Sequence, residues 1–107
     1  MQIKQAYQME EIAETVKKSN HSKILAANLK KLRLEHYKQY QKLNNKIDNP
    51  YSLDNISSLL GISRRHYSRL ENPNYTTKNI TLEKLIILSK IYEIKIDNLV
   101  SDLLDQI

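Results

Sequence analysis

Residues 52–72 read SLDNISSLLGISRRHYSRLEN, and this stretch decides the fold. Two short helical patterns, over residues 53–60 and 63–71, flank Gly61, which is the only glycine in the chain. A glycine enters positive φ at little cost, so Gly61 suits a sharp reversal between two helices. The first pattern places three aliphatic side chains at inward-facing helical positions: Ile56, Leu59 and Leu60. The stretch therefore predicts a helix-turn-helix motif.

The second helical pattern separates apolar from basic side chains. Ser63 is a good N-cap residue, and Tyr67 and Leu70 have the i, i+3 spacing of a buried stripe. The outward positions carry only arginines and a small hydroxyl: Arg64, Arg65, Ser68 and Arg69. Arginine pairs with guanine O6 and N7 in the major groove, so the pattern favours DNA reading. An ordinary helical hairpin in a small core is the alternative.

The positive charge of the chain lies around the same stretch. The 107 residues carry a net charge of +5. Residues 17–70 hold 12 lysines or arginines against three acids, whereas both flanking segments are net negative. Such a local surplus suits the neutralisation of phosphates and predicts salt-sensitive binding. A solvated lysine-rich surface is the alternative.

Composition restricts the class of protein. One glycine and two prolines argue against a turn-rich β fold, and without cysteine the chain forms no disulfide or thiolate-metal site. There is no HExxH motif and no glycine-rich phosphate loop, so we expect no enzyme, no metal and no cofactor. The sequence lacks a membrane-length apolar run and a signal-peptide core, which predicts a cytoplasmic location. Its abundant Lys, Ile and Asn favour a bacterial or phage source.

Four phrases, in order, resemble the Cro/CI-type (XRE-like) helix-turn-helix regulators. They are LAANLKKLR (25–33), SLDNISSLLGIS (52–63), RRHYSRLEN (64–72) and TLEKLIILSKIYEIKIDNLV (81–100). The resemblance implies an all-α, five-helix lambda-repressor-like DNA-binding domain over residues 22–107. An additional N-terminal helical arm is expected over residues 1–21. The resemblance also implies a nucleoid-associated transcriptional repressor that reads double-stranded DNA with helix 63–71 and binds as a homodimer.

The resemblance places Arg64, Arg65, Ser68 and Arg69 at bases. It further implies an ion pair between Arg33 and Glu71, which would tie the first long helix to the end of the recognition helix. Helix starts and the polar loop after the motif are expected to supply phosphate contacts: Ser52, Ser63, His66, Asn72, Asn74, Tyr75, Thr76 and Lys78. A packing role is the alternative for His66, and a place at the edge of the core is the alternative for Tyr75.

Helical spacing outside the motif predicts three more domain helices. The first runs over residues 23–43 with an inner stripe of Leu25, Leu29, Leu32, Tyr40 and Leu43. The next is capped by Thr81, and its buried face is Leu82, Leu85, Ile86, Leu88 and Ile91. Asp97 is the expected cap of the last helix.

The two ends of the chain carry apolar stripes. In the arm, Met9, Ile12 and Val16 predict an amphipathic helix that packs on its own domain or on a partner copy; a frayed arm is the alternative. The C-terminal stripe predicts dimerisation, with core closure as the alternative, through Leu99, Val100, Leu103, Leu104 and Ile107. These ends also support a second class of function. In that class the chain is a protein-interaction module on the same fold, such as an antitoxin, an antirepressor or a phage accessory factor.

Overall fold

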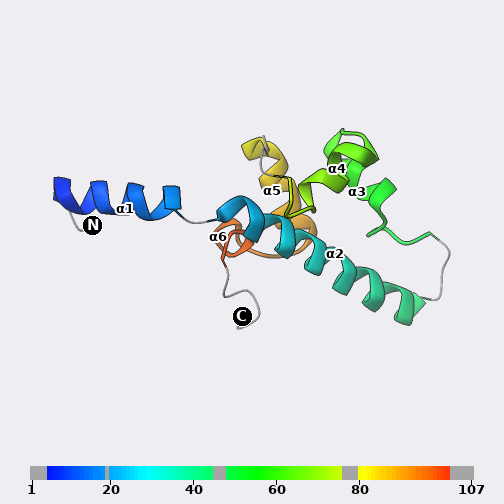
Figure 1. Cartoon of the computed structure of the whole chain (residues 1–107). Helices are drawn as coiled ribbons and strands as arrows, with labels where there is room; N and C mark the ends of the chain where they lie inside the picture. The colour runs from blue at the N-terminus through cyan, green and yellow to red at the C-terminus, as the bar shows by residue number, and fades with distance from the viewer. Residues whose placement is uncertain (1–4, 19, 45–47, 76–79, 102–107) are drawn as a thin grey trace.

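The computed structural model describes residues 5–18, 20–44, 48–75 and 80–101, and all regular secondary structure in these ranges is helical. The all-α prediction is therefore confirmed for the part of the chain described. In Figure 1, α2 forms a long rod that carries the other domain helices, and α1 stands apart from this body. The helices are α1 (Ala6–Lys18), α2 (His21–Asn44), α3 (Leu53–Leu60), α4 (Arg64–Leu70), α5 (Leu82–Ile91) and α6 (Ile96–Leu99).

The five helices from α2 through α6 share one hydrophobic core. Each of these five helices contributes one large side chain that is fully buried: Leu29, Ile56, Tyr67, Leu88 and Leu99. Burying each such side chain stabilises the fold by roughly 1.5–3 kcal/mol. By contrast, every α1 side chain from Ala6 to Val16 is exposed, so the described part of α1 adds nothing to this core.

An amide on α2 closes the C-terminal side of the core. The last carbonyl groups of a helix have no partner inside the helix. The Asn28 side-chain nitrogen donates to the Leu99 carbonyl oxygen at 2.8 Å and to the Ser101 carbonyl oxygen at 3.0 Å. Asn28 is itself buried, and these two bonds fix the end of α6 against α2.

The predicted helix start at Thr81 is confirmed, and two other predicted helix starts are wrong. The Thr81 hydroxyl accepts the Lys84 N–H, as expected. α2 begins at His21 rather than at residue 23, because the Asn20 carbonyl already accepts the Ile24 N–H at 2.9 Å. α6 begins at Ile96 with Lys95 as its N-cap residue and without a side-chain cap bond, so the prediction of an Asp97 cap is wrong.

Several predicted core residues are exposed. Leu59 is 53% exposed, because the buried side of α3 consists of Ile56, Leu60 and Ser57. The Ser57 hydroxyl is satisfied within the helix, donating to the Asp54 carbonyl at 3.0 Å. Leu43 is 73% exposed near the end of α2, and two residues on the outer face of α5 are also exposed: Leu82 and Ile86.

Candidate functional site

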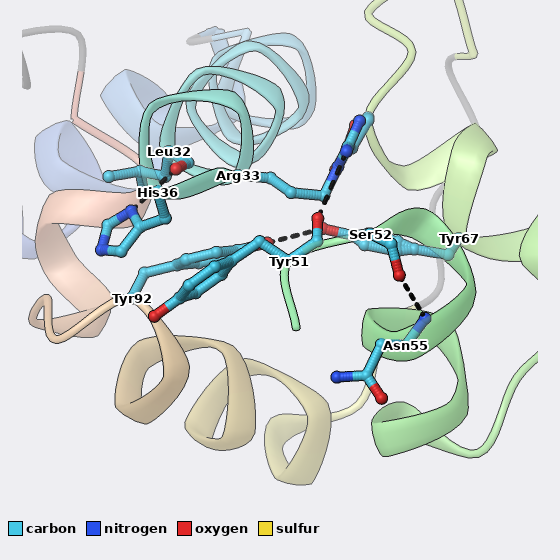
Figure 2. Close-up of polar contacts among 9 residues, drawn as sticks. Leu32, Arg33, His36, Tyr51, Ser52, Asn55, Tyr67 and Tyr92 are labelled. Atoms are coloured by element: carbon cyan, nitrogen blue, oxygen red, sulfur yellow. Dashed lines mark hydrogen bonds and ion pairs between the residues drawn. The ribbon is translucent and has the colours of Figure 1, made fainter. Parts of the chain in front are cut away.

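Two capped helices and one left-handed glycine build the predicted motif. The Ser52 hydroxyl accepts the Asn55 N–H at 3.1 Å and starts α3, as Figure 2 shows. Gly61 ends α3 at φ 71° and ψ 29°, the left-handed region in which glycine carries no Cβ penalty. Its N–H and that of Ile62 donate to carbonyls of the last turn, which closes the reversal. The predicted turn is confirmed.

α4 follows at once and has two unlike sides. The Ser63 hydroxyl accepts the His66 N–H at 3.0 Å, which confirms the predicted N-cap. Tyr67 and Leu70 are buried against the core, as their spacing predicted. Glu71 is the C-cap residue. The residues between these anchors point away from the core, so the helix is held at both ends and along its inner side.

The inner side of α4 is locked to α2 by a buried ion pair. Arg33 Nε donates to Glu71 Oε2 at 2.7 Å, and Arg33 Nη2 donates to Glu71 Oε1 at 3.0 Å. Both residues are buried, and a third guanidinium bond reaches the Tyr51 carbonyl at 3.4 Å (Figure 2). Burial opposes the charged form of Arg33, but the hydrogen bond and the charge of Glu71 outweigh it and raise the pKa of Arg33. The predicted pair is confirmed.

A second polar contact lies beneath α4. The Tyr67 and Tyr92 hydroxyl oxygens are 3.2 Å apart and share a hydrogen bond in the core. Burial raises the pKa of both hydroxyls far above their ordinary value, because neither phenolate could be solvated there. Tyr92 also belongs to a ring cluster with His36 and Tyr51, whose centroids lie 5.1–6.4 Å apart (Figure 2). The position of α4 thus depends on α2 and on the end of α5.

The outer side of α4 gathers the predicted base-contacting residues. Arg65 and Ser68 are exposed, and Arg65 is two residues from the buried Tyr67, on the opposite side of the helix. Arg64 leans toward α3, where its Nη1 lies 3.5 Å from Asp54 Oδ1. Those two side chains are 63% and 75% exposed, so the pair adds little stability. The predicted arginines are therefore not equivalent, because Arg64 has a carboxylate partner in Asp54.

Arg69 has a different neighbour. Its guanidinium carbon lies over the Tyr75 ring, 5.1 Å from the ring centre. Tyr75 is 41% exposed, so its place at the core edge is wrong, and its phosphate contact stays a prediction. The structure also orders the start of the loop, since the Asn72 side-chain oxygen accepts the Asn74 N–H at 2.9 Å.

The remaining predicted phosphate contacts come from the starts of α3 and α4, from α4 itself and from the segment after it. His66 is exposed rather than packed, so the packing alternative for this residue is wrong. Ser52 and Ser63 use a lone pair each for their helix caps and keep a hydroxyl proton to donate. Thr76 and Lys78 lie outside the described residues.

The predicted dimer stripe is not one surface. Leu99 is fully buried in the core of its own chain, so it closes the core and its assignment to a dimer interface is wrong. Val100 is exposed. The other three members lie outside the described residues: Leu103, Leu104 and Ile107.

A buried amide that the sequence patterns do not single out lies in the connector before α3. Asn49, an ordinary turn residue by type, is buried. Its Nδ2 donates to the Tyr37 carbonyl at 2.9 Å, and its Oδ1 accepts the Tyr51 N–H at 3.0 Å. The Asn-Pro-Tyr order is a turn signal, but only the fold shows that the turn docks on α2. Asn49 thereby fixes the entry into the motif.

Comparisons with protein-family models, with curated proteins and with solved structures found no match to this chain. Among the described residues, no group of three His, Cys, Asp or Glu side chains is placed to hold a metal ion. None of the helices in that part of the chain combines the length and apolar character needed to cross a membrane.

Proposed function

We propose that this chain is a sequence-specific DNA-binding transcriptional regulator of the Cro/CI-type (XRE-like) class, with a lambda-repressor-like fold. The observation that carries the proposal is the outer side of α4. There Arg65 and Ser68 are exposed and Arg69 is half-buried, while Tyr67 and Leu70 are buried on the other side. An exposed helix of this kind fits the major groove, and its arginines match guanine edges.

Rigid support of α4 strengthens the proposal. Base reading requires side chains held on a fixed element, so that specificity is not lost to motion. The Arg33–Glu71 pair and the Tyr67–Tyr92 bond hold α4 from beneath. The basic surplus of residues 17–70 would supply the salt-dependent phosphate attraction. In this proposal the regulator acts as a repressor by occupying its operator, as a homodimer, in the nucleoid of a bacterial or phage-infected cell.

The test starts with selection of bound sequences from a random DNA pool. A palindromic consensus would support base reading by a two-fold dimer. Arg65→Ala should then weaken binding to the selected sequence roughly 5- to 150-fold, since a good arginine–guanine pair is worth about 1–3 kcal/mol. Lys38→Ala is the matched control, because Lys38 is an exposed cation of α2 outside the motif. No enriched sequence, or equal losses in the two variants, would contradict the proposal.

A second candidate function rests on α1. Its Met9, Ile12 and Val16 side chains are 60%, 45% and 54% exposed along one face. A 13-residue helix with an exposed apolar face is marginal in water by itself. This favours a protein-interaction module, such as an antitoxin, an antirepressor or a phage accessory factor. Recovery of a stoichiometric protein partner that Ile12→Asp abolishes, in a chain without DNA affinity, would select this candidate over the first.

A further inference from the structure

A hydrogen-bonded turn over residues 72–75 follows α4. The Asn72 carbonyl accepts the Tyr75 N–H at 3.1 Å, and the Asn72 side-chain oxygen accepts the Asn74 N–H at 2.9 Å. Pro73 occupies the second position of this four-residue turn, where its fixed φ is favourable. These bonds close a four-residue turn whose last residue is Tyr75.

This turn brings an aromatic face to Arg69. The guanidinium carbon lies over the Tyr75 ring at 5.1 Å from its centre, within the range of a cation–π contact. A cation–π contact with the face of a ring does not engage the guanidinium N–H groups in hydrogen bonds. No ion pair or hydrogen bond of the Arg69 side chain occurs within the described residues. Its donors therefore stay available for an acceptor in a ligand.

Arg64 shows the opposite arrangement on the same helix. Its guanidinium lies 3.5 Å from the Asp54 carboxylate, which offsets its charge and competes for its donors. Arg69 instead lies over a neutral ring, and no carboxylate within the described residues pairs with it. An arginine held in this way loses less side-chain freedom when it binds, which favours a correctly placed acceptor over a displaced one.

We propose that Tyr75 is a positioning residue that orients Arg69 for base reading and so determines sequence specificity. This inference rests on the proposed function. It gives Tyr75 a role through its ring, distinct from a phosphate contact through its hydroxyl. Arg69 is the side chain that touches the base edge, and Tyr75 affects base reading through Arg69.

The test uses Tyr75→Leu, with Tyr75→Phe as the matched control that keeps the ring and removes the hydroxyl. Tyr75→Leu should weaken binding to the selected sequence roughly two- to fivefold, the fold-change that matches an exposed cation–π contact. Binding to random-sequence DNA should not change, and Tyr75→Phe should behave as the wild type. In an Arg69→Ala background, Tyr75→Leu should have no further effect, because the two act as one unit. Equal losses in the Leu and Phe variants, or equal losses on both DNAs, would overturn the inference.

A measurement without DNA separates this inference from the proposed function. A ring face over the guanidinium should shift the Arg69 Hδ resonances upfield in the free protein. That shift should persist in Tyr75→Phe and vanish in Tyr75→Leu. If the wild type shows sequence preference but no such shift, the inference alone fails. If the wild type shows no sequence preference, the proposed function fails and the specificity role of Tyr75 fails with it, whatever the shift.

Discussion

The inner and outer sides of α4 use charge in opposite ways. On the inner side, Arg33 and Glu71 are buried and bonded through two N–H···O contacts. On the outer side, Arg64 and Asp54 form a longer, solvent-exposed pair, and Arg65 is exposed. Burial makes the loss of one partner costly, whereas water screens an exposed pair. The comparison implies that inner changes alter stability and outer changes alter binding.

The largest loss of stability should come from truncating a buried side chain on the inner side of α4. Tyr67→Ala should lower the free energy of unfolding by about 3–5 kcal/mol, because it leaves a cavity beneath α4 and removes the partner of the Tyr92 hydroxyl. Urea unfolding measures this loss. Arg65→Ala, two residues away on the outer side, should change stability by less than about 0.5 kcal/mol. Similar losses in the two variants would abolish the distinction between the sides.

Breaking the buried ion pair should cost nearly as much. Glu71→Gln keeps the shape of the side chain but leaves the Arg33 charge buried without its counterion, which should cost about 3 kcal/mol. Thermal unfolding, followed by circular dichroism, would measure it. Glu83→Gln on the exposed first turn of α5 is the control and should stay near the wild type. If Glu71→Gln were as stable as the wild type, the ion pair would orient α4 without stabilising the fold.

The buried tyrosines should make stability depend on alkaline pH. Their pKa values are raised in the folded protein, so the proton is bound more tightly there than in the unfolded chain. Their stabilising contribution is complete below about pH 10, the ordinary tyrosine pKa, and is lost as the pH rises above it. Each buried hydroxyl should then cost about 1.4 kcal/mol per pH unit. Urea unfolding between pH 9 and 11 gives the change of the unfolding free energy with pH. That change per pH unit should be smaller in Tyr92→Phe than in the wild type, and an equal change would contradict the assignment.

The smallest effect should come from the cap at the start of α4. Ser63→Ala removes the acceptor of the His66 N–H and should cost about 1 kcal/mol. Ser68→Ala makes the same chemical change on the exposed side of the same helix and should cost much less. Chemical unfolding of the two variants sharpens the comparison within a single helix. A larger loss in Ser68→Ala would mean that the outer side also supports the fold.

Local chemistry predicted the motif well. Gly61, Ser52 and Ser63 act through neighbours within a few residues, and all three did what their residue types favour. The Arg33–Glu71 pair was expected only from the family resemblance, since nothing local relates residues 38 positions apart. Periodicity predicted that Leu59 and Leu82 lie on buried helix faces, but it could not tell which face the tertiary packing would leave in solvent.

The errors at the site have the same origin. The burial of Asn49 could not be predicted from the connector, because its partners Tyr37 and Gln41 lie on α2. Leu99 looked available for a dimer, because its spacing cannot show that α6 packs on α2 in the same chain. The pairing of Arg64 with Asp54 depends on the angle between α3 and α4, which the turn residues alone do not specify.

The bonds from Asn28 to the carbonyls of Leu99 and Ser101 span 71 and 73 positions of the chain. During synthesis, α2 would emerge long before Leu99 and Ser101, so the core could not be completed until residues 99–101 were available. The two motif helices need only each other and a tight reversal to meet. Folding would thus begin in the middle of the polypeptide and be completed by the joining of its distant parts, a closure that sets the rate.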